Sequence, residues 1–137
     1  QESAGIATFD GTTVHLHKEM GLVSQVFNES ILQQMPGRMA VGHTRYSTTG
    51  SSRVVNAQPA VVETRLGSLA LAHNGNLVNT RDLREELLQR QCNFNTTTDS
   101  EAIAFAIAEA VNDGKDWLDG AITAFKRCYG AFSLVVG

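Results

Sequence analysis

Short segments of alternating apolar and polar residues fill the first half of the chain, and a period of two is typical of β-strands. The Asp10-Gly11 pair favours a type I′ hairpin turn, because both central residues of that turn need positive φ. A short helix over residues 28–35, capped by Asn28, interrupts the strands. The strand candidates are residues 3–9, 12–19, 22–27, 38–46 and 58–73, the last of which is divided into two strands by a turn at Leu66-Gly67.

Apolar positions repeat with a period of about 3.6 from Asn79 onward, which predicts helices. The first helix begins at an Asn79 or Thr80 cap and carries a stripe of Leu83, Leu87 and Leu88. The second begins at Thr98, where residues 98–101 fit a capping box, and it continues to Gly114. Its stripe consists of Ile103, Ile107 and Val111.

A third helix and a final strand complete the pattern. The helix has a predicted buried stripe of Leu118, Ile122, Phe125 and Tyr129, and Gly130 leads from it into the strand at residues 131–136. Because strands come first and helices later, without regular alternation, the chain is expected to adopt an α+β fold with an antiparallel sheet.

Composition narrows the classes of function. The 137 residues suit one domain, and the net charge of -3, with scattered Lys and Arg, offers no basic stripe for nucleic acid or for a membrane surface. No apolar run approaches the roughly 18 residues of a membrane span, which favours a soluble, cytoplasmic protein. Cys92 and Cys128 lie outside any CxxC spacing and are expected to be free thiols.

Asn74-Gly75 is the first candidate for chemistry. An Asn-Gly pair after a strand is most often a hairpin turn. Here a helix follows, so the pair is expected in a strand-to-helix loop, where Gly permits close approach and Asn offers its side-chain amide. Two such N–H donors could form an oxyanion hole, in which each donor is worth about 3 to 4 kcal/mol in an acyl-transfer transition state.

Arg45, Thr48 and Asp99 are the other candidates. The planar fork of Arg45 suits a carboxylate, with the Thr48 hydroxyl beside it, although a surface pair with Glu63 explains Arg45 equally well. Residues 49–53 also resemble an anion-binding nest, and Asp99 could serve only to favour a helix N-terminus. Taken together with Asn74-Gly75, the set matches an amino acid with an amide side chain.

The remaining candidate residues indicate structural roles. His15 and His17 share one face of a hairpin strand and are expected to face solvent, whereas His43 and His73 are expected to be buried and hydrogen-bonded. Cys92 and Cys128 lie beside apolar helix positions. The sequence therefore offers no convincing nucleophile.

Four motifs in fixed order resemble a known family. They are QESAGIA, GHTRYSTTGSS, AHNGNLVN and TTDSEAI. The chain resembles the glutaminase domain of class II (N-terminal-nucleophile) glutamine amidotransferases, in particular the phosphoribosylpyrophosphate amidotransferases of purine synthesis. Tyr46 and the residues after it are typical of that branch, whereas glucosamine-6-phosphate synthases have a Trp and a His in this loop.

The resemblance implies a fold and a reaction. The fold is the four-layer αββα sandwich, here an incomplete domain. The reaction is hydrolysis of glutamine to glutamate and ammonia, which serves the synthesis of 5-phosphoribosylamine in the first committed step of purine synthesis. Arg45, Thr48 and Asp99 would bind glutamine, and Asn74 and Gly75 would form the oxyanion hole. The family's nucleophile is an N-terminal Cys, which residues 1–137 do not contain, so this chain alone is expected to be inactive.

The resemblance also implies parts that lie outside these residues. Residues 1–137 correspond to part of a type 2 glutamine amidotransferase domain, without the segment that carries the nucleophile and without the phosphoribosyltransferase domain. The phosphoribosyl pyrophosphate site, Mg²⁺, an iron–sulfur cluster and the contacts of a homo-oligomer are expected in the other parts, with no cofactor in this segment. Alternatives are another class II enzyme such as glucosamine-6-phosphate synthase, or a non-catalytic glutamine-binding module.

Overall fold

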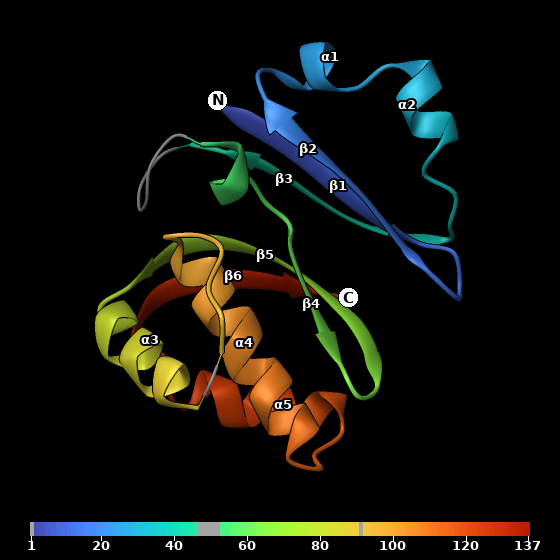
Figure 1. Cartoon of the computed structure of the whole chain (residues 1–137). Coiled ribbons are helices and arrows are strands. Elements are labelled where there is room, and N and C mark those ends of the chain that lie inside the picture. The colour runs from blue at the N-terminus through green and yellow to red at the C-terminus, as the bar shows by residue number, and fades with distance from the viewer. Residues whose placement is uncertain (1, 47–52, 91) are drawn as a thin grey trace.

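Two three-stranded antiparallel sheets lie face to face in the computed structural model, which describes residues 2–46, 53–90 and 92–137 (Figure 1). Sheet A has the order β2-β1-β3 and sheet B the order β4-β5-β6. The strands are β1 (Ser3–Phe9), β2 (Val14–Met20), β3 (Met39–Arg45), β4 (Ala60–Thr64), β5 (Gly67–Leu77) and β6 (Gly130–Val136). The predicted α+β fold is therefore confirmed.

Helices cover the outer faces of both sheets. Three of them, α3 (Thr80–Gln89), α4 (Asp99–Asn112) and α5 (Trp117–Phe125), lie on the face of sheet B that points away from sheet A (Figure 1). Two short helices, α1 (Val23–Val26) and α2 (Glu29–Gln33), lie beyond sheet A. The layers therefore follow the order helix, sheet, sheet, helix that the resemblance implies.

The predicted hairpin of β1 and β2 is confirmed, but its turn is longer than expected. Phe9 pairs with Val14, so four residues, Asp10 to Thr13, connect the strands. The Asp10 carboxylate accepts hydrogen bonds from the N–H groups of Thr12 (2.8 Å) and Thr13 (2.7 Å). The hydrogen bond with His15, together with these two main-chain bonds, lowers the pKa of Asp10 to about 2. Side-chain capping by Asp10 therefore replaces the predicted two-residue turn.

Helix α1 (Val23–Val26) occupies the middle of residues 22–27, where the sequence predicted a strand. The Gln25 side chain accepts a hydrogen bond from the Leu22 N–H (2.9 Å), and this local contact favours a helical turn over an extended chain. The segment packs on the outer face of sheet A, where the His17 ring bonds to the Val26 carbonyl (3.2 Å). In α2, the predicted Asn28 cap is confirmed, since its side chain accepts from the Ile31 N–H.

Helix α4 occupies the centre of the core on sheet B. Its positions Ile103, Ile107 and Val111 are fully buried, as their periodic spacing predicted, and they pack with Leu69 and Leu71 of β5. Helices α3 and α5 pack against α4 from either side (Figure 1).

The helix caps follow the prediction only in part. Thr98 caps α4 by accepting from the Glu101 N–H, but the Glu101 carboxylate bonds to the N–H groups of Asn95 and Thr96 instead of completing a capping box. The Asn79 side chain bridges the Arg127 carbonyl and the Tyr129 N–H, so it joins the end of α5 rather than capping α3. Asn79 thus serves a tertiary contact in place of a local one, whereas Glu101 binds the loop just before α4. Of the predicted α3 stripe, Leu83 and Leu87 are buried, while Leu88 is exposed.

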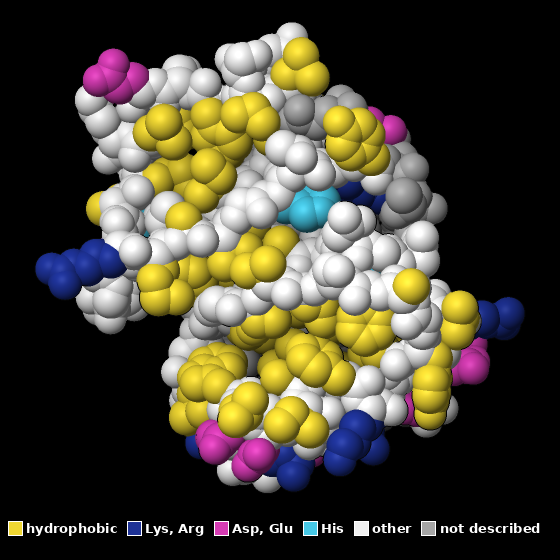
Figure 2. Space-filling view, turned by 180° about the vertical axis from the view of Figure 1, so that it is seen from behind, with side chains coloured by type: hydrophobic (Ala, Val, Ile, Leu, Met, Phe, Trp, Pro, Cys, Tyr) yellow, Lys and Arg dark blue, Asp and Glu magenta, His cyan; other side chains and the backbone are white. Residues whose placement is uncertain are grey.

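The predicted buried stripe of α5 is wrong at three of its four positions, while the fourth, Phe125, is partly buried and packs against the core. Leu118, Ile122 and Tyr129 are exposed, while the buried positions of α5 are Gly120 and Ala124. A Cβ added at Gly120 would lie 2.8 Å from the Val111 side chain, so α5 approaches α4 closely through its small residues. Close helix approach needs small residues at the contact, which leaves the large apolar residues outside. Figure 2 shows such side chains gathered over α5 and β6.

A segment that we name the strap, residues 54–59, crosses from sheet A to sheet B before β4. The Lys18 ammonium of β2 donates to the carbonyls of Ala57 (2.9 Å) and Pro59 (3.3 Å). The Gln58 carbonyl lies so close to Gly5 of β1 that a Cβ added there would overlap it. The strap is therefore packed tightly on sheet A.

Adding one methyl group tests this packing. Gly5→Ala is expected to lower the free energy of unfolding of the intact protein by about 1 to 3 kcal/mol, the usual cost of overpacking. The matched control is Gly42→Ala on the neighbouring strand, where an added Cβ would meet its nearest atoms at an ordinary 3.7 Å. Urea denaturation of both variants gives the comparison. Equal stability of Gly5→Ala and the wild type would contradict the close approach of the strap.

Candidate functional site

A cavity of about 230 Å³ lies between the end of β3, the second half of β5 and the start of α4. Four of the five predicted site residues line it, and the fifth, Thr48, lies outside the described residues, as does most of the predicted anion nest at residues 49–53. The lining residues are His43, Thr44, Arg45, Tyr46, Gln58, His73, Asn74, Gly75, Thr98, Asp99 and Ser100. The tertiary structure therefore brings together residues that lie up to 57 positions apart in the sequence.

Asn74 and Gly75 lie within β5, not in the strand-to-helix loop that the sequence predicted. They pair with Ser133 and Phe132 of β6. Gly75 has a φ of 138°, and a Cβ at this position would overlap the Ala131 carbonyl, so only glycine fits. The strand thus continues through the Asn-Gly pair to Leu77 because pairing with β6 stabilises it.

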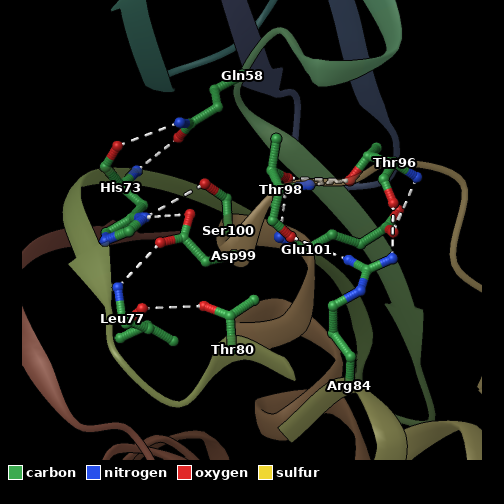
Figure 3. A network of polar contacts seen from close by, with 10 residues as sticks. All are labelled: Gln58, His73, Leu77, Thr80, Arg84, Thr96, Thr98, Asp99, Ser100 and Glu101. Carbon is green, nitrogen blue, oxygen red and sulfur yellow. Dashed lines mark hydrogen bonds and ion pairs between the residues drawn. The ribbon is translucent and has the colours of Figure 1, made fainter. Parts of the chain in front are cut away.

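The main chain of β5 directs the Gly75 N–H toward the cavity. Alternate residues of a strand present their N–H groups at the same edge. At the edge facing away from β6, the His73 N–H is bound by Gln58 and the Leu77 N–H by Asp99 (Figure 3). The Gly75 N–H lies between these two on the same edge. The Gly75 N–H is therefore a main-chain donor of β5 that faces the cavity.

Asp99, the first residue of α4, is buried with 4% of its surface exposed. Its carboxylate accepts from the Leu77 N–H (3.1 Å) and lies 3.4 Å from the Nδ1 atom of His73 (Figure 3). Burial opposes ionisation of Asp99, but the hydrogen bonds from His73 and Leu77 outweigh it and lower the pKa. Asp99 is therefore a buried carboxylate held in its ionised form.

The two histidines of the cavity have different surroundings. His73 is buried, and its Nδ1 atom lies within hydrogen-bond distance of Ser100 (3.3 Å) as well as Asp99. Because an ionised carboxylate only accepts, Nδ1 carries the proton. His43 is half-buried, and burial lowers its pKa despite a hydrogen bond to the main chain of His73. The predicted burial and hydrogen bonding of His73 are therefore confirmed.

Arg45 is the last residue of β3, and only 4% of its surface is exposed. The Glu63 carboxylate, its suggested surface partner, accepts instead from the Ser68 hydroxyl of the neighbouring strand (2.7 Å). The interpretation of Arg45 as a surface residue is therefore wrong. A buried guanidinium and a buried carboxylate, Asp99, line the same cavity, and such a pair of opposite charges suits a zwitterionic ligand.

Sequence reasoning missed Gln58. Its side-chain amide accepts from the His73 N–H (2.6 Å) and donates to the His73 carbonyl (3.1 Å). The sequence signal for this contact is weak: Gln58 is an amide residue that directly precedes Pro59 and a predicted strand. Sequence reasoning also missed Arg84, which donates to the carbonyls of Thr96 and Thr98 and so holds the segment that leads into α4 (Figure 3).

Metal binding and membrane crossing find no support in the described ranges. Within residues 2–46, 53–90 and 92–137, no three His, Cys, Asp or Glu side chains come together as metal ligands. His15 bonds to Asp10 (2.8 Å) instead. None of the helices in the same ranges is both long enough and apolar enough to cross a bilayer.

Comparison with known proteins gives consistent matches. An amidophosphoribosyltransferase from Synechocystis is 71% identical over 138 aligned residues, which cover this whole chain and 28% of that relative. A solved glutamine phosphoribosylpyrophosphate amidotransferase from B. subtilis, complexed with ADP and GMP, matches with a TM-score of 0.88 and 34% identity. A solved allosteric regulatory enzyme of purine biosynthesis matches with a TM-score of 0.90 and 36% identity.

Coverage sets the scope of these matches. Both solved structures cover the whole of this chain and 29% of their own. The chain thus spans less than a third of the proteins that it resembles. Residues 43–137 match the family model of the glutamine amidotransferase domain. The resemblance that the four motifs indicated is confirmed, and the chain belongs to the glutamine amidotransferase domain family.

Proposed function

We propose that this chain is the glutamine-binding part of an amidophosphoribosyltransferase. In this proposal the intact protein hydrolyses glutamine to glutamate and ammonia, and the ammonia serves the synthesis of 5-phosphoribosylamine in the first committed step of purine synthesis. The observation that carries the proposal is the single cavity lined by Arg45, Asn74, Gly75 and Asp99. Glutamine has a carboxylate, an ammonium and an amide, and the cavity offers a group for each.

The proposed roles follow from charge and hydrogen-bonding capacity. Arg45 binds the α-carboxylate through its planar fork, and Asp99, which is ionised, binds the α-ammonium. Thr48, by the family resemblance, adds a hydroxyl to the carboxylate site. These contacts fix both ends of the amino-acid backbone and leave the amide side chain to reach toward β5.

Asn74 and Gly75 are proposed to stabilise the transition state. A nucleophile that attacks the amide carbon turns the carbonyl oxygen into an oxyanion, and the Gly75 N–H and the Asn74 side-chain amide would donate to it. The C–N bond then breaks, and the amide nitrogen takes the proton that the nucleophile gave up and leaves as ammonia. Water hydrolyses the acyl intermediate to glutamate and restores the nucleophile. The residues that are seen to line the cavity include no cysteine. By the family resemblance, the thiol comes from an N-terminal Cys outside residues 1–137.

The acceptor half of the reaction belongs, in this proposal, to the remainder of the protein. Phosphoribosyl pyrophosphate, the metal that accompanies it and the contacts of a homo-oligomer would lie there. No step proposed for residues 1–137 uses a metal or an iron–sulfur cluster.

Arg45→Ala tests the binding role. In the intact protein the KM for glutamine is expected to rise by about 10- to 100-fold, because a charge-assisted hydrogen bond contributes roughly 1.5 to 3 kcal/mol. Activity with free ammonia is expected to stay within about twofold of wild type, because ammonia bypasses the glutamine site. Steady-state kinetics with both nitrogen donors give the result. An equal loss of both activities would contradict the assignment.

Asp99→Asn tests the charge of the second binding group. The KM for glutamine is expected to rise by more than about tenfold, since the neutral amide cannot pair with an ammonium. Because the pKa of Asp99 is lowered from 3.8, the carboxylate stays ionised from about pH 5 to 8. The ratio of the variant KM to the wild-type KM should therefore be constant across that range. A ratio that falls toward one at the acidic end would show that Asp99 is protonated there.

Asn74→Ala tests the oxyanion role. Removal of one donor is expected to lower kcat for glutamine hydrolysis by about 10²- to 10³-fold, with a smaller change in KM, because the donor acts mainly in the transition state. Measurement of glutamate release by the intact protein gives both constants. A rise in KM at unchanged kcat would assign Asn74 to ground-state binding instead.

A further inference from the structure

We propose that the strap, through Gln58, positions the oxyanion donors of β5. The inference rests on the proposed function, because it assigns to Gln58 a role in the reaction of that site. Gln58 lies in the cavity wall with 7% of its surface exposed. It is a positioning residue, since it acts through the main chain of His73.

Strand register explains why Gln58 contacts His73. In the ladder of β4 and β5, Ala60 pairs with Leu71, and two residues further along each strand Gln58 lies opposite His73. At this point the main chain of the strap turns away to sheet A, where Lys18 holds the carbonyls of Ala57 and Pro59. The Gln58 side-chain amide takes the place of the missing strand partner, since it bonds to both the N–H and the carbonyl of His73.

These two hydrogen bonds fix the peptide unit that leads into Asn74. The His73 carbonyl and the Asn74 N–H belong to one planar peptide group, so a bond to the carbonyl sets the direction of the whole group. The orientation of this peptide group sets the direction of the Asn74 side chain. It also sets the direction of the next peptide group, which carries the Gly75 N–H. Gln58 thus fixes both proposed oxyanion donors from one side.

Asp99 fixes the same edge from the other side. Its bond to the Leu77 N–H lies two residues beyond Gly75, and the Gln58 bond to the His73 N–H lies two residues before it. The edge of β5 therefore has a bound donor at each end and the Gly75 N–H between them. A ligand oxygen can reach this donor because β4 begins only at Ala60, opposite Leu71, and so does not extend as a strand along this part of β5.

The strap also holds the segment before Asp99. The Asn56 side chain donates to the Thr97 hydroxyl and accepts from the Thr97 N–H, both at 3.1 Å. Asn56 thus makes two hydrogen bonds to the segment just before α4, in the same way that Gln58 makes two hydrogen bonds to β5. One segment therefore sets the position of Asp99 relative to Asn74 and Gly75.

Two variants of the intact protein test the inference. Gln58→Met keeps the side-chain volume but removes both bonds to His73. The kcat for glutamine hydrolysis is expected to fall by about 10- to 100-fold, because a small misplacement of catalytic groups lowers the rate by this much. The KM for glutamine is expected to stay within about threefold of wild type. Asn56→Leu removes both bonds to Thr97, and the KM for glutamine is expected to rise by about 10-fold with a smaller change in kcat.

Asn79→Leu is the matched control. The Asn79 amide makes the same kind of two-bond bridge, to Arg127 and Tyr129, but it does not line the cavity. This variant is expected to lower the Tm while kcat and KM stay within about twofold of wild type. Thermal unfolding of all three variants measures their stability alongside the kinetics.

Each outcome decides the inference. If Gln58→Met fails to unfold cooperatively, the KM of Asn56→Leu carries the test. If both fail while Asn79→Leu folds, the strap serves stability and the proposal is overturned. The same holds if a folded Gln58→Met keeps the wild-type kcat, or if Asn79→Leu loses as much kcat. Normal kinetics of Gln58→Met together with the expected losses in Arg45→Ala and Asn74→Ala would reject this inference but leave the proposed function intact.

Discussion

Packing of α4 on sheet B is the constraint on which the site depends. Of the fourteen residues in this helix, eleven are buried, and alternate small residues let it lie close to β5 and α5. A helix fixed along its whole length has its N-terminus fixed as well, so Asp99 meets β5 at one defined place. The hydrophobic core thereby determines where the carboxylate of the site lies.

Buried polar groups complete this arrangement. A buried donor or acceptor without a partner costs about 1 to 3 kcal/mol, so burial favours arrangements in which such groups are bonded. At the site, side chains bond to the main chain of another element: Gln58 to His73, Asn56 to Thr97 and Asp99 to Leu77. Such bonds depend on direction, whereas apolar packing does not. They therefore define the geometry that the core leaves open.

The exposed apolar groove of α5 and β6 stands in contrast to the site. The partly buried side chains of Phe125, Phe132 and Leu134 line it. Ile122 of α5 is exposed. This surface results from the packing of α5 on α4 through Gly120 and Ala124. The periodic spacing of large apolar residues in α5 correctly indicated a helix, but it assigned the buried face to the wrong side. Periodicity reports that a face is apolar and does not report which neighbour, if any, covers it.

The sequence by itself determined most of the elements and indicated the candidate chemistry. The turn residues around β1 and β2, the period of α4 and the Thr98 cap are local signals, and each acts within a few residues of itself. The four motifs indicated the family and the candidate residues. Only the tertiary structure decided that Asn74-Gly75 continues β5, that Arg45 is buried, that Asn79 bridges to the end of α5, and that Gln58 replaces a strand partner of His73. Those outcomes depend on contacts between segments far apart in the chain, whose free energy no local pattern contains.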